Sequence, residues 1–392
     1  MKSETAFDSD LRRLDAEIEE LQETALRVPV DAERATRYVY RLYQRASLKG
    51  DLQELDAAQE ALDIAIRHVG PAPDLAYVRA SIDFKLHRLQ ETRRDMEAVP
   101  ELLESFEGRT LLAELAFEEG RYEEARQGYE KLIEEEPTWD NLARLAHLHA
   151  ALGDVEVADR FYLEAEDELT AKEMRSFAWV ELQRGKLALQ LGRAGDARSI
   201  YERAGRAYTG YWLTDEHMAE LLGATGKFDE AIALYRRALA RVAKPEIEQA
   251  LGKLYSLVGQ PEEAEGYYER ALDAYLKSAA RGDVHYYHHL VDFYTNARED
   301  KALALEWARK DCELRPNFRT QGALAHALYL NGLIPEALSV IREALASGAR
   351  GGHLLRDAAL IHRAAGEAGE AHRFEHLAAG LNPHEEAFHV HH

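Results

Sequence analysis

The sequence contains a single cysteine, Cys312, and only 10 prolines among its 392 residues. One cysteine excludes an intramolecular disulfide and any metal site built from several cysteines. Scarce proline, together with abundant Ala, Leu, Glu and Arg, predicts an all-α protein, because these residues have high helix propensity. No stretch approaches the roughly 20 apolar residues that a membrane-spanning helix needs, so we expect no membrane insertion.

Positive charge is also in short supply. The chain carries 49 Lys and Arg against 71 Asp and Glu, a formal net charge of -22. General binders of nucleic acids or anionic membranes need the opposite sign, because Lys and Arg must neutralise phosphates. We therefore expect no nucleic-acid partner. The N-terminal segment lacks the apolar region of a secretory signal, which predicts a cytoplasmic protein. A periplasmic or secreted protein is the alternative if a signal peptide has been removed.

Small residues recur along the chain at a nearly constant period. The spacings of the anchoring alanines are 33, 39, 34, 33, 40, 33 and 34 residues, for Ala125, Ala158, Ala197, Ala231, Ala264, Ala304, Ala337 and Ala371. Most units carry a second small residue twelve positions earlier and a third seven positions later. Such positions let two antiparallel helices approach closely and let the next pair stack on them. Glycines between the expected helices, such as Gly120, Gly226 and Gly332, suit left-handed helix C-caps.

This pattern resembles the tetratricopeptide repeat, a 34-residue helix-turn-helix unit. The resemblance implies a right-handed superhelical solenoid of about ten such repeats, forming an open, curved rod. It divides the chain into an N-terminal capping helix (1–30), divergent repeats (31–107), the repeat array proper (108–383) and a His-rich C-terminal tail (384–392). The 39- and 40-residue spacings predict lengthened helices or loops near 166–184 and 272–290. One unit has Asp311 where the third small residue is expected, which leaves its packing in question.

The resemblance also implies a function. Such arrays bind peptides or partner proteins in a concave groove lined by the first helix of each repeat. The leading hypothesis is therefore a non-catalytic scaffold for a protein or peptide partner. We expect no enzyme activity, since the chain has no phosphate-binding loop, dinucleotide fingerprint, nucleophile elbow or HExxH motif. A role as the sensor part of a larger complex is a further hypothesis. The sequence gives neither the partner nor the oligomeric state.

The family places ligand contacts at the second, fifth, ninth and twelfth positions of each first helix. Carried onto the last three units, these positions give Tyr286, His289, Phe293 and Asn296, then Arg319, Gly322, His326 and Tyr329, then His353, Arg356, Leu360 and Arg363. Arg319 and Arg356 are candidates to hold a ligand carboxylate. The alternative is that these arginines pair with acidic neighbours across repeats. Equivalent positions upstream include Glu216, Glu220 and Glu246, and opposite signs along one groove would fix the direction of a bound chain.

Histidines form the second notable group, with 17 in the chain. His285 and His289 lie four residues apart, so on one helix they would share a face and chelate one ion. His389 and His391 would point to one side of an extended tail. Imidazole binds Zn, Cu and Ni. The competing hypothesis is thus a metal-binding protein that uses its C-terminal histidines and has the solenoid as a docking platform. Inter-repeat packing of His285 and His289, and a frayed terminus or cloning remnant for the tail, are the alternatives. Otherwise we expect no cofactor.

Overall fold

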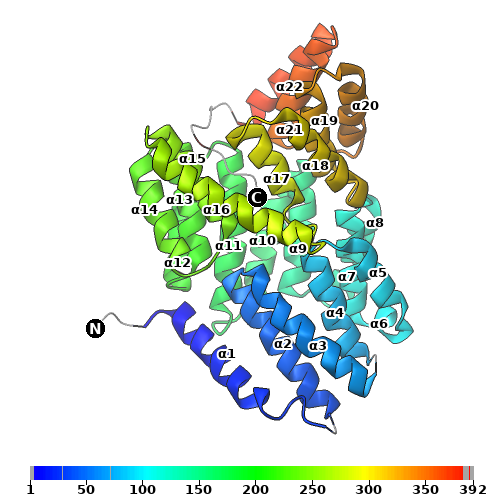
Figure 1. Cartoon of the computed structure of the whole chain (residues 1–392). Helices are drawn as coiled ribbons and strands as arrows, with labels where there is room; N and C mark the ends of the chain where they lie inside the picture. The colour runs from blue at the N-terminus through cyan, green and yellow to red at the C-terminus, as the bar shows by residue number, and fades with distance from the viewer. Residues whose placement is uncertain (1–3, 29, 71, 383–387, 389–392) are drawn as a thin grey trace.

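The computed structural model describes residues 4–28, 30–70, 72–382 and 388. Its regular structure is helical throughout the described residues, as predicted (Figure 1). The helices are α1 (Ala6–Gln22), α2 (Ala32–Lys49), α3 (Leu55–Val69), α4 (Pro73–Lys85), α5 (Leu89–Glu97), α6 (Pro100–Glu104), α7 (Phe106–Glu118), α8 (Tyr122–Glu135), α9 (Trp139–Leu152), α10 (Val155–Asp167), α11 (Met174–Gln190), α12 (Ala194–Ala207), α13 (Trp212–Ala224), α14 (Phe228–Leu239), α15 (Pro245–Leu257), α16 (Pro261–Ala280), α17 (Tyr287–Asp292), α18 (Lys301–Leu314), α19 (Phe318–Leu330), α20 (Ile334–Ala346), α21 (Gly352–Ala364) and α22 (Ala368–Leu381).

Consecutive helices form hairpins that stack into one array. The pairs in the described residues are α2/α3, α4/α5, α7/α8, α9/α10, α11/α12, α13/α14, α15/α16, α17/α18, α19/α20 and α21/α22. These pairs match the predicted solenoid of about ten repeats. The N-terminal helix α1 packs on α2 at one end of the array. Figure 1 shows the chain winding from the blue helices α1–α3, through the green helices α11–α14, to the orange and red helices α18–α22.

The periodic small residues lie where the helices approach most closely. None of the eight anchoring alanines is more than 3% exposed. Tyr129, Tyr162, Tyr201 and Tyr235 fill the space between the helices and are at most 2% exposed. Because any larger side chain at an anchoring position would push two helices apart, these alanines set the spacing of the array.

The two long spacings produce longer helices, as expected. Helix α11 has 17 residues and α16 has 20, whereas the neighbouring α13 has 13. The repeat that follows α16 is irregular as well, because α17 ends after six residues and continues as a π-helix over Phe293–Ala297. A π-helix adds a residue to its turn, so side chains beyond Asp292 are rotated from the faces that the repeat frame predicts.

Hairpins that are five or six pairs apart in the array touch each other. In the first pair, the Leu48 carbonyl accepts a 2.9 Å hydrogen bond from the Trp212 indole, which begins the sixth pair. In the second pair, the Leu86 carbonyl accepts a hydrogen bond from the Val284 amide, which lies just before the eighth pair. In the third, the Tyr122 hydroxyl accepts a 2.9 Å bond from the Phe318 amide of the ninth. The array therefore completes one superhelical turn and contacts itself.

We call this line of contacts the seam. It replaces the open rod that the sequence predicted, because the rotation between successive repeats brings the second superhelical turn against the first. Turn glycines make the approach close. A Cβ on Gly50 would lie 2.6 Å from the Trp212 ring, and one on Gly120 would lie 2.6 Å from the Pro316 carbonyl oxygen. The seam joins residues nearly 200 positions apart, for example Glu118 and Asn317.

Asp311, the residue that breaks the small-residue pattern, is buried beside the seam. It is 1% exposed, and Arg315 is 4% exposed. The Arg315 guanidinium donates hydrogen bonds of 2.9 and 2.6 Å to Asp311 Oδ1. A further Arg315 nitrogen contacts the His87 ring at the end of the second pair's first helix. A buried ion pair thus occupies the place where other repeats have a small apolar residue.

None of the helices in the described parts of the chain is long and apolar enough to cross a membrane.

Candidate functional site

The first helices of the repeats bring their polar side chains together on one surface, which we call the inner wall. Arg319 of α19 donates a 2.9 Å hydrogen bond to His147 Nε2 of α9, five hairpins earlier. The charge of Arg319 also reaches Lys186 of α11 and Glu118 of α7. Residues from both superhelical turns therefore contribute to the inner wall.

Acidic side chains form the part of the inner wall made by α13 and α15. Glu216 is 2% exposed, and Glu220 and Glu246 are each 6% exposed. Lys244 Nζ lies 3.2 Å from Glu246 Oε1. Glu246 Oε2 is buried and has no hydrogen-bond partner among the described atoms. Leaving a carboxylate oxygen buried without a partner is costly, so Glu246 is a candidate ligand-binding group.

Burial shifts the pKa values of three basic groups on first helices of the repeats, Lys85, His147 and Lys186. Desolvation, with a smaller contribution from the charge of Lys244, lowers the pKa of Lys85 to about 8. Desolvation lowers the pKa of Lys186 as well. It lowers the pKa of His147 to about 3, with the charge of Arg319 acting in the same direction. His147 is therefore a neutral imidazole that accepts a hydrogen bond from Arg319.

Three side chains of α15 and the α17 segment come close enough to share a ligand. One ligand atom each from Glu246, His285 and His289 lies within 4.8 Å of the other two. His285 precedes α17 rather than belonging to it, so the two histidines do not share a helix face as the sequence predicted. They nevertheless converge with Glu246, because α15 and the segment that holds both histidines belong to neighbouring repeats. Desolvation, followed by the charge of His288, lowers the pKa of His285 well below its ordinary value.

The remaining groove residues predicted in the α17 repeat lie mainly in the core. Tyr286 is 6% exposed, and its ring centroid lies 4.9 Å from that of Tyr275. Phe293 is fully buried and packs edge-on against Tyr268. It is inaccessible to a ligand here, since it begins the π-helix. Asn296 is exposed and donates a 2.6 Å hydrogen bond to Asp292.

Predicted residues in the last two repeats are more accessible. Arg319, His353, Arg356 and Arg363 are exposed, Leu360 is 39% exposed, and Gly322 is buried. Arg356 donates a 3.1 Å hydrogen bond to His353 Nδ1, whereas Arg363 pairs with Glu375.

His326 and Tyr329, also in α19, are half-buried, with ring centroids 6.2 Å apart. His326 Nδ1 lies 2.8 Å from Asp357 Oδ1. Burial opposes protonation of His326, but the hydrogen bond and charge of Asp357 outweigh it and raise its pKa. The pair therefore links α19 to α21 within the wall.

His389 and His391, the predicted metal ligands of the tail, lie outside the described residues. Phe388, between them and the array, is described and was missed by the sequence reasoning. It is 1% exposed and packs among residues of α13 and α14. The sequence does contain a signal for it, because Phe388 and Val390 are the two large apolar residues among the polar residues 384–392.

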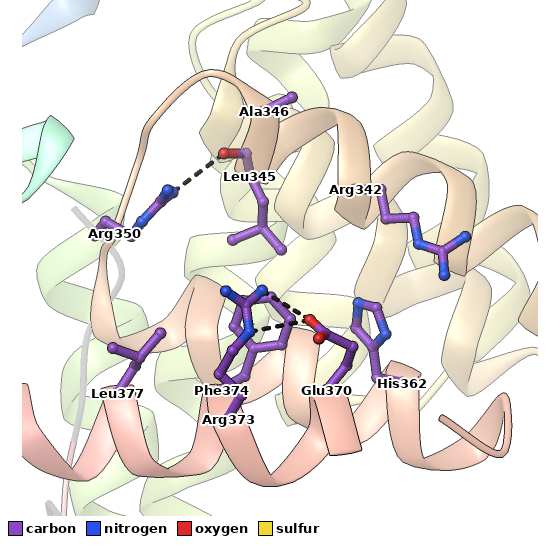
Figure 2. Close-up of a pocket in the computed structure, with 9 residues that line it drawn as sticks. All are labelled: Arg342, Leu345, Ala346, Arg350, His362, Glu370, Arg373, Phe374 and Leu377. Carbon is purple, nitrogen blue, oxygen red and sulfur yellow. Dashed lines mark hydrogen bonds and ion pairs between the residues drawn. The ribbon is translucent and has the colours of Figure 1, made fainter. Parts of the chain in front are cut away.

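A separate pocket of about 330 Å³ lies between α20, α21 and α22 (Figure 2). Arg373 pairs with Glu370 at 2.7 Å, and Arg350 donates to the Leu345 carbonyl. Arg342 pairs with Glu367, next to the pocket. Its guanidinium groups thus already bind carboxylate or carbonyl oxygens, and two of its three helices are second helices of their repeats. We therefore take the inner wall, and not this pocket, as the candidate site.

Comparisons with known proteins agree with this architecture. Residues 213–277 match the family model described as "Tetratricopeptide repeat". This part of the chain contains tetratricopeptide repeats. Residues 107–182 also match the model described as "TT21 fifth ARM repeats domain". A search of curated proteins gave no match. The resemblance drawn from the sequence is thus confirmed, and the tetratricopeptide fold suggests a protein-interaction scaffold of a generally non-catalytic kind.

Two solved structures are similar to the tetratricopeptide array over different lengths. The crystal structure of the APC/C hetero-tetramer Cut9-Hcn1 is 16% identical, with a TM-score of 0.44, and the match covers 89% of this chain and 74% of that one. TTC0263, a thermophilic TPR protein in Thermus thermophilus, is 26% identical, with a TM-score of 0.37. That match covers 45% of this chain and 98% of TTC0263.

Proposed function

We propose that the inner wall of the tetratricopeptide array binds an extended segment of a partner protein. This proposal is supported mainly by the exposure and the hydrogen bonding of Arg319 and Arg356. Each guanidinium is exposed, and each donates to an imidazole, His147 or His353. An imidazole acceptor supplies no counter-charge to a guanidinium, so a ligand carboxylate would still form a charge-assisted bond with it.

The separation of acidic and basic side chains along the inner wall supports binding of a partner segment in one direction. Buried carboxylates of α13 and α15, Glu216, Glu220 and Glu246, lie in one part of the wall, and the exposed arginines of α19 and α21 lie in another. A bound segment would place an acidic side chain or its C-terminal carboxylate toward Arg319 and Arg356, and a basic or neutral part toward α13. Such complementarity sets the orientation of a ligand more than its affinity.

Charge reversal tests this proposal. The double variant Arg319→Glu/Arg356→Glu should recover about tenfold less partner than the native chain, because both carboxylate contacts become repulsive. Partners captured by each immobilised protein from native lysate are quantified by mass spectrometry. The matched control is Arg309→Glu/Arg342→Glu, which makes the same change of charge on the second helices α18 and α20. Equal recovery by the two double variants would remove the proposal.

Metal binding is a second candidate function, favoured by the convergence of Glu246, His285 and His289. Two imidazoles and a carboxylate are a ligand set that suits Zn²⁺, which binds nitrogen at roughly 2.0–2.1 Å. Ligand atoms bound to one Zn²⁺ at that distance lie roughly 3.3 Å apart, so three atoms that lie within 4.8 Å of one another would have to approach by up to about 1.5 Å. His285 is held neutral by its lowered pKa, so no proton would have to be displaced from it.

Calorimetric titration with Zn²⁺, Ni²⁺ and Cu²⁺ separates the two metal hypotheses. If the inner wall binds the ion, Glu246→Gln and His289→Ala should each weaken binding by roughly 10–100-fold. The variant His389→Ala/His391→Ala should then bind as the native chain does, and the opposite pattern would assign the ion to the tail. His372→Ala, which alters an exposed histidine of α22, serves as the control. Binding weaker than micromolar by the native chain would eliminate both sites.

A further inference from the structure

Phe388 is six positions beyond Asn382, yet its side chain lies deep in the middle of the array. It is 1% exposed and belongs to an apolar cluster to which α1, α2 and α11–α16 contribute. Its ring centroid lies 6.2 Å from that of Tyr235, with an interplanar angle of 61°. This edge-to-face arrangement is one that aromatic pairs prefer.

A glycine in the first helix of the sixth pair creates the space for this ring. A Cβ on Gly223 would lie 2.5 Å from Phe388 Cδ1 and 2.9 Å from Cγ. No side chain other than hydrogen fits there while the ring is in place. Glycine inside a helix costs roughly 1 kcal/mol relative to alanine, so its presence near the end of α13 needs a compensating contact. The Phe388 ring supplies that contact.

The neighbouring repeat supplies a further contact to the Phe388 ring. Lys253 Nζ of α15 lies 5.5 Å from the centroid of the Phe388 ring, within the range of a cation–π contact. In the repeat frame, Gly223 is the twelfth residue of its first helix and Lys253 is the ninth of the next. Both positions are those at which the family contacts ligands. Phe388 therefore packs against two positions of the inner wall, as well as against Tyr235 between the helices.

We propose that Gly223, Tyr235 and Lys253 form an aromatic subsite, which this chain's own C-terminal segment fills through Phe388 and from which a partner's aromatic side chain displaces it. The inference rests on the proposed binding function of the inner wall. It adds that one anchor of the partner segment is aromatic, and that this chain's own C-terminal segment competes with the partner for the same subsite. The partner segment carries a phenylalanine or a similar aromatic residue.

Covalent attachment makes the tail an effective competitor. A short tether gives an effective concentration on the order of millimolar, so even a weakly binding anchor keeps the subsite filled. When the tail occupies about nine-tenths of the molecules, the apparent affinity of a competing segment falls about tenfold. Removal of the Phe388 ring should restore that affinity without any change in the wall.

The test uses the full chain and a fluorescent peptide of the sequence HEEAFHVHH, which copies residues 384–392. Fluorescence anisotropy should show that Phe388→Ala binds this peptide about tenfold more tightly than the native chain. A peptide with Ala in place of Phe should not bind. In the Phe388→Ala background, Gly223→Leu fills the subsite and should abolish binding. Gly195→Leu, at an exposed helical glycine with open space around it, should leave binding unchanged.

Site-specific 4-fluorophenylalanine at position 388 provides a second readout in a chain that keeps its ring. Its ¹⁹F resonance should report a buried environment, and excess peptide should shift it to the exposed value. Equal peptide affinity for the native and Phe388→Ala chains, or an exposed resonance without peptide, would overturn the competition. Failure of folded Phe388→Ala to bind the peptide would overturn the subsite. Partner capture that still depends on Arg319 and Arg356 would show that the scaffold function survives either failure.

Discussion

The variant Arg315→Met is expected to lower the free energy of unfolding by about 3–5 kcal/mol. Arg315 is 4% exposed, and it donates two hydrogen bonds to Asp311, which is 1% exposed. Burial lowers the pKa of Arg315 to about 9, still far enough above neutral pH for the guanidinium to keep its charge. Removing it leaves the Asp311 carboxylate without its counter-charge, and an unpaired buried charge is costly. Urea denaturation monitored by circular dichroism measures the loss.

A double-mutant cycle separates the coupling free energy between Asp311 and Arg315 from the effects of the single substitutions. Asp311→Ala restores the small residue of the repeat pattern but leaves Arg315 buried alone, so it should also destabilise by several kcal/mol, roughly 3. The double variant Asp311→Ala/Arg315→Met should lie within about 1 kcal/mol of the native chain or exceed it, because neither charge remains. If the two single losses simply add, the residues are not an ion pair that matters for stability.

The cost of Arg315→Met should depend on pH. Burial, followed by the charge of Glu118, raises the pKa of Asp311 well above its ordinary value. A raised folded-state pKa means that the folded chain binds more protons than the unfolded chain, so stability falls as pH rises between the two values. Without the charge of Arg315 the pKa of Asp311 should rise further, so the variant loses stability over a wider range of rising pH than the native chain does, and the penalty of Arg315→Met should be largest at pH 8. It should shrink as the pH is lowered toward the unfolded-state value of about 4.

The second large effect is expected at the seam. Gly120→Ala should lower the free energy of unfolding by about 3 kcal/mol, whereas Gly332→Ala should cost about 1 kcal/mol. Both glycines end first helices with nearly equal φ values, +76° and +74°, so alanine has the same left-handed backbone penalty at each. They differ in surroundings. A Cβ added at Gly120 would lie 2.6 Å from the Pro316 carbonyl oxygen, whereas one added at Gly332 would have no described atom within 4 Å apart from its chain neighbours.

Thermal and urea unfolding of the two alanine variants give the comparison directly. Backbone strain cancels between them, so the difference reports the contact between superhelical turns. A difference below about 0.5 kcal/mol would mean that the seam at Gly120 opens at little cost.

Much of the fold followed from local pattern. Small residues at a fixed period predicted the hairpins, because the packing of each anchoring alanine depends only on the adjacent helix. Asp311 was recognised as a break in the pattern, but not as half of an ion pair, since Arg315 is an ordinary charged residue in the sequence. Phe293 shows the limit of the repeat frame. The frame assigns it to the groove, and the π-helix that it begins buries it in the core.

Features that depend on the superhelix as a whole could not be predicted. The seam results from small rotations that accumulate over five or six hairpins, and no single repeat encodes its pitch. Glu246 was assigned to the groove, but its convergence with His285 and His289 depends on how α15 packs on α17. Phe388 lies beyond the last repeat, so the period carries no information about where its ring packs.

The seam also changes how the molecule must assemble. In a linear repeat array each unit contacts only its neighbours, so folding can start anywhere and the ends can fray independently. Here Tyr122 and Phe318 share a hydrogen bond across 196 positions, and Leu48 and Trp212 across 164. Such contacts raise the contact order and form only after most of the chain is in place. The two superhelical turns should therefore unfold in one cooperative transition, and loss of a terminal hairpin should loosen the repeats that lie five or six hairpins away from it.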